Sequence, residues 1–151
     1  VLLDPQYTNL TSVFEYFIGN LDFSPVMGAA DKTCCHNYSL FSSDRESFWP
    51  IPYDFDLTGF VESKHAVLDP KGPRRNLRQR VYYGWCRNEE FLPQSLQAFR
   101  DKRGEIEALI AAQPELKDNV RERLQDYIEG FYDELEDEDE LISEFADECR
   151  G

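Results

Sequence analysis

Apolar side chains recur at steps of three and four near the start of the chain, which is typical of a helix with one buried face. Asp4-Pro5 precedes this stripe and provides a capping side chain followed by proline at the first helical position. Gly19-Asn20 follows the stripe and is a stop signal. The pattern therefore predicts a helix over 5–18. Its apolar positions are Leu10, Val13, Phe14, Phe17 and Ile18.

Two short apolar runs follow, over 37–42 and 48–55, with the polar sequence SSDRES between them. Runs of this length that are separated by a polar turn predict an antiparallel hairpin. The flanking stretches 21–34 and 57–73 are rich in Pro, Gly, Ser and Asp, so we expect them to be loops.

Helical spacing dominates the second half. The strongest stripe begins near Pro114 and keeps its apolar side chains on one face. The other expected helices cover about 74–84, 93–103, 105–112 and the acidic tail. This order predicts an α+β, mostly α fold: a single domain over 1–151, with a short β hairpin in 1–86 and an acidic helical part in 87–151.

Charge is distributed unevenly along this 151-residue chain of net charge −14. Residues 1–86 carry ten acids and eight bases, whereas 87–151 carry twenty acids and eight bases. Nucleic-acid binding relies on Lys and Arg contacts to phosphate, so an acidic chain of this kind argues against a nucleic-acid partner. No apolar run approaches the ~20 residues of a membrane span.

Asp22, Asn37, Asp54 and Asp56 form the first candidate site. Asp is a poor strand former, yet two Asp residues end the second apolar run. The outer ends of a hairpin are neighbours in space, so Asn37 and Asp54 are expected to meet there. Carboxylate and amide oxygens suit magnesium. The alternative is structural, with Asn37 capping the hairpin and Asp54 serving as a turn residue.

Four sequence blocks, IGNLDFS, CCHNYSLF, WPIPYDFDLTGF and LRQRVYYGWC, together resemble a family of uncharacterised bacterial proteins related to the CotH-type atypical kinases. Their order is also similar to the carboxy-terminal lobe of HipA-like and lipid kinases. The resemblance implies a kinase-like C-lobe, with Asp22 as the catalytic-loop Asp and Asn37 as the metal-binding Asn. Asp54 corresponds to the DFG-like Asp, and Asp56 is a further cofactor ligand. Asn20 is the alternative to Asp22.

The resemblance also implies the reaction. It is transfer of the γ-phosphoryl group of ATP, with Mg²⁺, to a hydroxyl of a protein or a small molecule. Such a lobe works with an amino-terminal lobe that carries a phosphate-gripping Lys, which we expect to be missing from this sequence. The exposed cleft would then favour a homodimer of the fragment, and the isolated chain would be inactive. The alternative is a pseudokinase or a helical binding or scaffolding module without catalysis.

The basic run 64–80 offers further candidates. Arg74 and Arg78 could present their guanidinium groups to a phosphate or an acidic substrate. The alternative is that these arginines pair with the acidic helices of the second half, and that Arg78 or Arg80 is an internal strut to a carboxylate.

Four cysteines remain to be placed. Adjacent Cys34-Cys35 do not offer the separated spacing of a zinc site. In the kinase-like arrangement Cys86 is expected to flank the same loop, which favours a disulfide from Cys34 or Cys35 to Cys86 and leaves Cys149 unpaired. The alternative is buried free thiols. Relatives in this resemblance are often exported, so we expect an exported, periplasmic or cell-surface protein.

Overall fold

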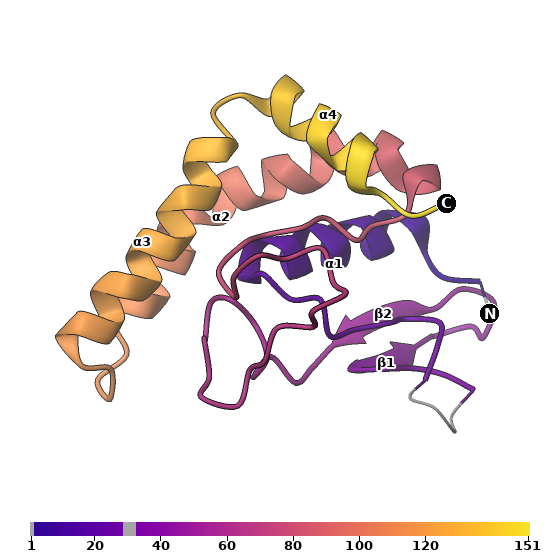
Figure 1. The fold of residues 1–151 in the computed structure, drawn as a ribbon. Helices are drawn as coiled ribbons and strands as arrows, with labels where there is room; N and C mark the ends of the chain where they lie inside the picture. Colours follow the sequence, from indigo (N-terminus) through magenta and orange to yellow (C-terminus); the bar gives the residue numbers. More distant parts are fainter. Residues whose placement is uncertain (1, 29–32) are drawn as a thin grey trace.

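A computed structural model describes residues 2–28 and 33–151 of the chain (Figure 1). Helix α1 (Pro5–Ile18) lies between a two-stranded hairpin on one side and the helices of the second half on the other. The hairpin and the loops around it therefore share α1 as their common support.

Helix α1 begins and ends where the sequence predicts. The Asp4 side chain accepts a 2.7 Å hydrogen bond from the backbone N–H of Tyr7, which satisfies one of the free donors of the first turn. Gly19 ends the helix in the left-handed conformation, with φ of 66°. The chain then turns sharply toward Asp22.

The predicted hairpin is also present. Strands β1 (Tyr38–Phe41) and β2 (Trp49–Pro52) pair antiparallel, with Tyr38 opposite Pro52 and Phe41 opposite Trp49. Continuing this register brings Asn37 opposite Tyr53, and the Tyr53 N–H donates to the Asn37 carbonyl at 3.0 Å. The base of the hairpin is therefore closed by Asn37, a predicted site residue, and by Tyr53, which precedes Asp54.

The second half consists of helices. The 3₁₀ helix η1 (Cys86–Phe91) runs into α2 (Leu92–Ala111), which forms an antiparallel pair with α3 (Asp118–Glu134), and α4 (Glu138–Glu148) returns over the other end of α1 (Figure 1). The α+β, mostly α fold is confirmed. The predicted boundary near residue 104 is wrong, because α2 runs unbroken through exposed Gly104.

Residues 74–84 do not form the predicted helix. The segment runs as turns and extended chain, because its polar groups find tertiary partners instead of helical ones. The Tyr82 N–H donates to the Glu148 carboxylate at 2.6 Å, and the Arg80 guanidinium donates to the carbonyls of Phe17 and Tyr127. Tertiary contacts have overridden local propensity here.

Aromatic side chains fill the core between α1 and the later helices. Tyr82 stacks on Phe145 with ring centroids 4.1 Å apart, and Tyr16 meets the same Phe145 ring edge-on at 4.6 Å. Phe17 and Phe131 pack at 5.0 Å. Aromatic pairs in these geometries stabilise beyond their buried area, so α4 and the 74–84 segment are both fixed to α1.

None of the helices in the described parts of the chain combines the length with the apolar character that crossing a bilayer requires.

Candidate functional site around Asp22 and Asn37

The Asn20 side chain connects the loop that carries Asp22 to helix α1. The Asn20 side chain is buried, and its Nδ2 donates to Glu15 Oε2 at 2.9 Å. Its Oδ1 accepts the backbone N–H of Asp22 at 3.0 Å. Asn20, the predicted alternative to Asp22, is therefore a buried support for the loop.

Glu15 is the buried end of this support. Its side chain lies in the interior with 1% of its surface exposed, and burial raises its pKa to about 7 against the opposing hydrogen bonds from Asn20 and Tyr38. Burial also raises the pKa of the neighbouring Tyr38 phenol, and the charge of Glu15 adds to this effect. Glu15 therefore carries a proton over part of the neutral range.

Asn37 connects the hairpin to the Asp22 loop. Its Nδ2 donates to the Asp22 carbonyl at 2.7 Å and to Asp22 Oδ2 at 3.1 Å. The amide oxygen of Asn37 takes no part in these bonds, so it can still act as a ligand or acceptor. The structure thus brings together Asp22 and Asn37, two of the predicted site residues.

His36 is a member of this group that the sequence reasoning missed. Its Nε2 lies 2.8 Å from Asp22 Oδ1, so the two oxygens of the carboxylate have different partners. The Asp22 side chain remains 39% exposed. The one available signal was the position of His36 directly before Asn37, which puts both side chains at the start of the hairpin.

Asp54 follows the residue that pairs with Asn37. Its backbone has φ of 62°, and that of Asn37 has φ of 54°. Left-handed conformations are uncommon for residues with a side chain, although Asn and Asp adopt them most readily, and such residues cluster at functional sites. Asp54 and Asp56 are exposed, and Phe55 between them packs against Phe14 at 5.6 Å. Phe55 therefore packs inward and anchors the turn, while the carboxylates of Asp54 and Asp56 face solvent.

The oxygen donors at the base of the hairpin are of the type that Mg²⁺ prefers. The Asn37 amide oxygen and the Asp54 and Asp56 carboxylates are engaged in no hydrogen bond or ion pair within the described ranges. The donor set therefore fits a magnesium ion chemically. The three carboxylates of Asp22, Asp54 and Asp56 are not gathered as a trio around one point in the part of the chain that is described.

A cavity of about 340 Å³ opens beside Asp22. Asp22 and Arg74 both lie on its wall, together with Leu57, Tyr83 and the loop 66–73. Arg74 Nη1 donates to the Gly19 carbonyl at 3.0 Å and to that of Leu77 at 3.3 Å, and burial lowers its pKa. Arg74 is thus part of the wall next to Asp22, fixed by the backbone around it.

Arg78 and Arg80 are engaged elsewhere. Arg78 pairs with Glu62 at 3.6 Å and stacks on the Tyr127 ring at 4.9 Å, and its contact with a phosphate stays a prediction. Arg80 lies over the same ring at 4.0 Å and pairs with Glu134 at 3.8 Å. The expected internal strut to a carboxylate is therefore Arg80.

The predicted disulfide from Cys34 or Cys35 to Cys86 is wrong. Cys86 pairs with Cys149, and Cys34 pairs with Cys35. The reason is the return of the chain after α4, which places Arg150 beside Trp85 in a short parallel bridge. This return places Cys149 beside Cys86, so the prediction that Cys149 is unpaired is also wrong.

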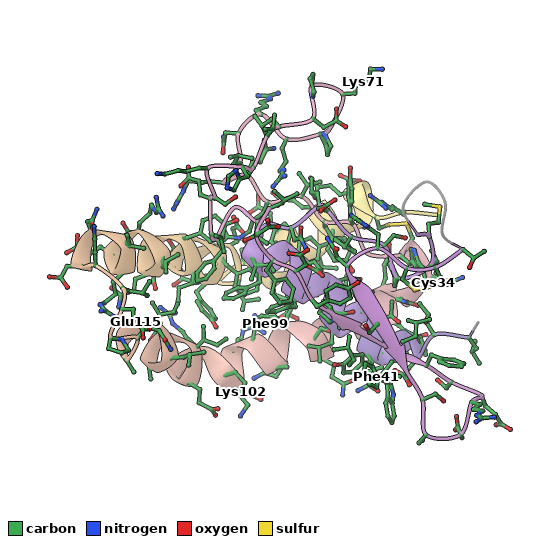
Figure 2. The ribbon with its side chains drawn as sticks, turned by 90° about the horizontal axis from the view of Figure 1, so that it is seen from below. Cys34, Phe41, Lys71, Phe99, Lys102 and Glu115 are labelled. Carbon is green, nitrogen blue, oxygen red and sulfur yellow. A yellow bond between two sulfur atoms is a disulfide. The ribbon has the colours of Figure 1, made fainter. Side chains whose placement is uncertain are left out.

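A second, larger groove of about 830 Å³ lies between α1, α2 and the end of the hairpin. Phe14, Phe55 and Phe99 contribute to its apolar wall, and Lys102 stands at its rim. Figure 2 shows Lys102 on the outer side of α2 and Lys71 at the tip of the loop that projects from the body of the molecule. Phe55 thus links this groove to the turn that carries Asp54 and Asp56.

Comparisons with protein-family models, with curated proteins and with solved structures found no match for this chain.

Proposed function

We propose that this chain is the carboxylate-bearing lobe of a kinase-like phosphotransferase that transfers the γ-phosphoryl group of ATP to a hydroxyl group. The observation that carries the proposal is the contact between Asn37 and Asp22, with Asp54 directly after Tyr53, which pairs with Asn37 across the hairpin. Phosphoryl transfer needs few protein groups: a carboxylate to orient the hydroxyl and an Asn and an Asp to hold the metal.

Asp22 is the proposed acceptor of the hydroxyl proton. Its two oxygens each have one partner, His36 or Asn37, and a carboxylate oxygen has room for a second hydrogen bond. As the hydroxyl oxygen bonds to phosphorus, the bond to the leaving nucleoside diphosphate breaks and the proton moves to Asp22. His36 and Asn37 hold the carboxylate in one orientation for this transfer.

Asn37 and Asp54 are the proposed metal ligands, with Asp56 as a further ligand. When bound, magnesium–ATP supplies a phosphoryl group whose negative charge is partly neutralised. The left-handed backbone at Asn37 and at Asp54 turns both residues out of the strands, which supports a role beyond strand pairing.

The cavity beside Asp22 is the proposed acceptor site. Its size suits one side chain or a small molecule, and Asp22 and Arg74 lie on its wall. A second lobe, with a Lys for the phosphates, would complete the site. We therefore expect the isolated chain to bind magnesium–nucleotide weakly and to turn over negligibly.

Thermal unfolding with ATP, in the presence and absence of Mg²⁺, tests the proposal. ATP should raise the midpoint only when Mg²⁺ is present, because binding to the native state stabilises it by mass action. Asp54→Ala should abolish this shift. Asp139→Ala, an exposed carboxylate in the first turn of α4, should leave it unchanged. The absence of any shift at saturating ATP, or an equal shift in Asp54→Ala, would overturn the proposal.

A further inference from the structure

The tail of the chain meets the beginning of η1 at a cluster of three side chains: Cys86, Glu89 and Cys149. Their sulfur and carboxylate ligand atoms all lie within 4.8 Å of one another. We propose that, when the cysteines are reduced, this cluster binds one thiophilic divalent cation of the zinc class, and that the Cys86–Cys149 disulfide is the oxidised alternative to that metal site.

The local structure explains why these side chains converge. Cys86 and Glu89 are three residues apart in a 3₁₀ helix, where side chains at this spacing lie directly above one another. Cys149 is the C-cap of α4 and arrives from the other side, with its Sγ 3.4 Å from Glu89 Oε1. Two elements that are distant in sequence thus contribute to one cluster.

Contacts other than the disulfide also hold the segments of the cluster together. The Cys86 N–H donates to the Arg150 carbonyl at 2.9 Å, and the Arg150 N–H donates to the Gly84 carbonyl at 2.8 Å. The stack of Tyr82 on Phe145 also holds α4 against the same segment. Reduction would therefore leave two thiols facing each other beside a carboxylate.

The donor set is typical of zinc. Two thiolates and one carboxylate supply three ligands at about 2.0–2.3 Å, so in a tetrahedral site two ligand atoms lie roughly 3.4–3.8 Å apart. The separation of 3.4 Å between Cys149 Sγ and Glu89 Oε1 matches this spacing, and the two sulfurs, which are bonded to each other in the disulfide, would move apart on reduction. Water would fill the fourth position, as in zinc sites with three protein ligands.

The neighbouring arginines Arg87 and Arg150 stack on aromatic rings and do not pair with the Glu89 carboxylate. Arg87 stacks on the Trp85 ring at 4.1 Å, and Arg150 stacks on the Tyr83 ring at 3.5 Å. In the described parts of the chain Glu89 has no ion pair with a Lys or Arg side chain. It is therefore available to a metal ion.

The metal-bound state and the disulfide state both form from the same pair of thiols, Cys86 and Cys149. Metal binding displaces one proton from each thiol. Oxidation removes two electrons and two protons from the thiol pair and forms the S–S bond, with a disulfide such as oxidised glutathione as the acceptor that is reduced to two thiols. The same residues thus close the tail onto η1 in a reducing or an oxidising environment.

Cobalt titration of the reduced chain tests the inference, because Co²⁺ reports thiolate ligation in its absorption spectrum. Cys34→Ser/Cys35→Ser is the starting protein, which removes the other two thiols. We expect one Co²⁺ per chain, a thiolate charge-transfer band, displacement by Zn²⁺, and no band after oxidation. Cys149→Ser should lose the band.

Glu89→Gln is the variant that separates a built site from an ordinary thiol pair, because it keeps both cysteines. It should weaken the cobalt affinity at least roughly tenfold, the scale of losing a partner at a metal site. Glu90→Gln, its exposed neighbour, should bind like the starting protein. A reduced chain without a thiolate band, equal affinity in Glu89→Gln and Glu90→Gln, or equal binding by the oxidised chain would overturn the inference.

Discussion

Asn37 donates from one amide nitrogen to both the backbone carbonyl and the carboxylate of Asp22, at 2.7 and 3.1 Å, although fifteen positions separate the two residues. This contact joins the end of α1 to the start of β1. It fixes the Asp22 carboxylate from the hairpin side, while Asn20 fixes its backbone from the helix side. The geometry of the candidate site rests on these two side chains.

Substitution of Asn37 should separate its side-chain bonds from its backbone conformation. Asn37→Gly removes the side-chain amide, and glycine adopts φ of 54° without strain. The free energy of unfolding in urea should therefore fall by about 1–2 kcal/mol, which is the contribution of the lost hydrogen bonds. Asn37→Ala should cost roughly 1 kcal/mol more, because alanine is strained in the left-handed region. Equal stability of the two variants would contradict this account of Asn37.

Glu15 should make the free energy of unfolding depend on pH. Burial raises its pKa from 4.5 to about 7 in the folded state, so the folded protein holds a proton there that the unfolded chain releases. The contribution of Glu15 to the free energy of unfolding is therefore fully present below about pH 4.5. It decreases by roughly 2–4 kcal/mol as the pH rises to 7 and beyond.

Glu15→Gln should remove this dependence, because glutamine stays neutral and can still accept from Asn20. The difference in unfolding free energy between the wild-type chain and Glu15→Gln, measured from pH 4 to pH 8, should turn against the wild type as the pH rises. Glu140→Gln, on the exposed face of α4, is the control. A pH-independent difference would show that folding does not raise the pKa of Glu15.

Local signals were sufficient to predict α1 and the hairpin, because capping residues, proline and the polar turn act within a few positions. The sequence grouped Asp22 with Asn37 in one candidate site, and the structure brings the two into contact. The partner of Cys86 could not be predicted, since it depends on α4 folding back over α1 and bringing Cys149 with it. Residues 74–84 have a helical composition, but the carbonyls at the end of α1 and in α3 bind their arginines.

Gly19 should not tolerate a side chain. Its φ is 66°, and a Cβ there would lie 2.1 Å from the Tyr127 hydroxyl. Gly19→Ala should therefore destabilise the chain by more than the ~1 kcal/mol of left-handed strain alone, as measured by urea unfolding. Tyr127→Phe should partly rescue Gly19→Ala, since it removes the clashing oxygen. By itself Tyr127→Phe should cost little, because this buried hydroxyl has no hydrogen-bond partner among the described residues. Additive effects of the two substitutions would contradict the proposed clash.

The Cys86–Cys149 disulfide should account for much of the stability of the tail. It joins residues 63 positions apart, and closing a loop of that length stabilises by about 4 kcal/mol in the chain-entropy account. Cys86→Ser/Cys149→Ser should lose stability on this scale without added metal. The Cys34–Cys35 disulfide joins adjacent residues and closes almost no loop. Cys34→Ser/Cys35→Ser should therefore change the free energy of unfolding by less than about 1 kcal/mol. Similar losses in both double variants, measured by urea unfolding, would refute this.

The most direct test of the nucleotide site is to locate a paramagnetic Mn²⁺–ATP complex on the ¹⁵N-labelled chain by NMR. The cysteines are kept oxidised, which removes the thiolate ligands of the other candidate metal site. The account predicts selective broadening of the amide signals of Asn37, Tyr53 and Asp54, with the Asn37 side-chain amide among the first to vanish. Asp54→Ala should abolish the effect. Broadening confined to the acidic residues of α4, or no broadening that depends on ATP, would contradict the assignment of Asn37 and Asp54 as metal ligands.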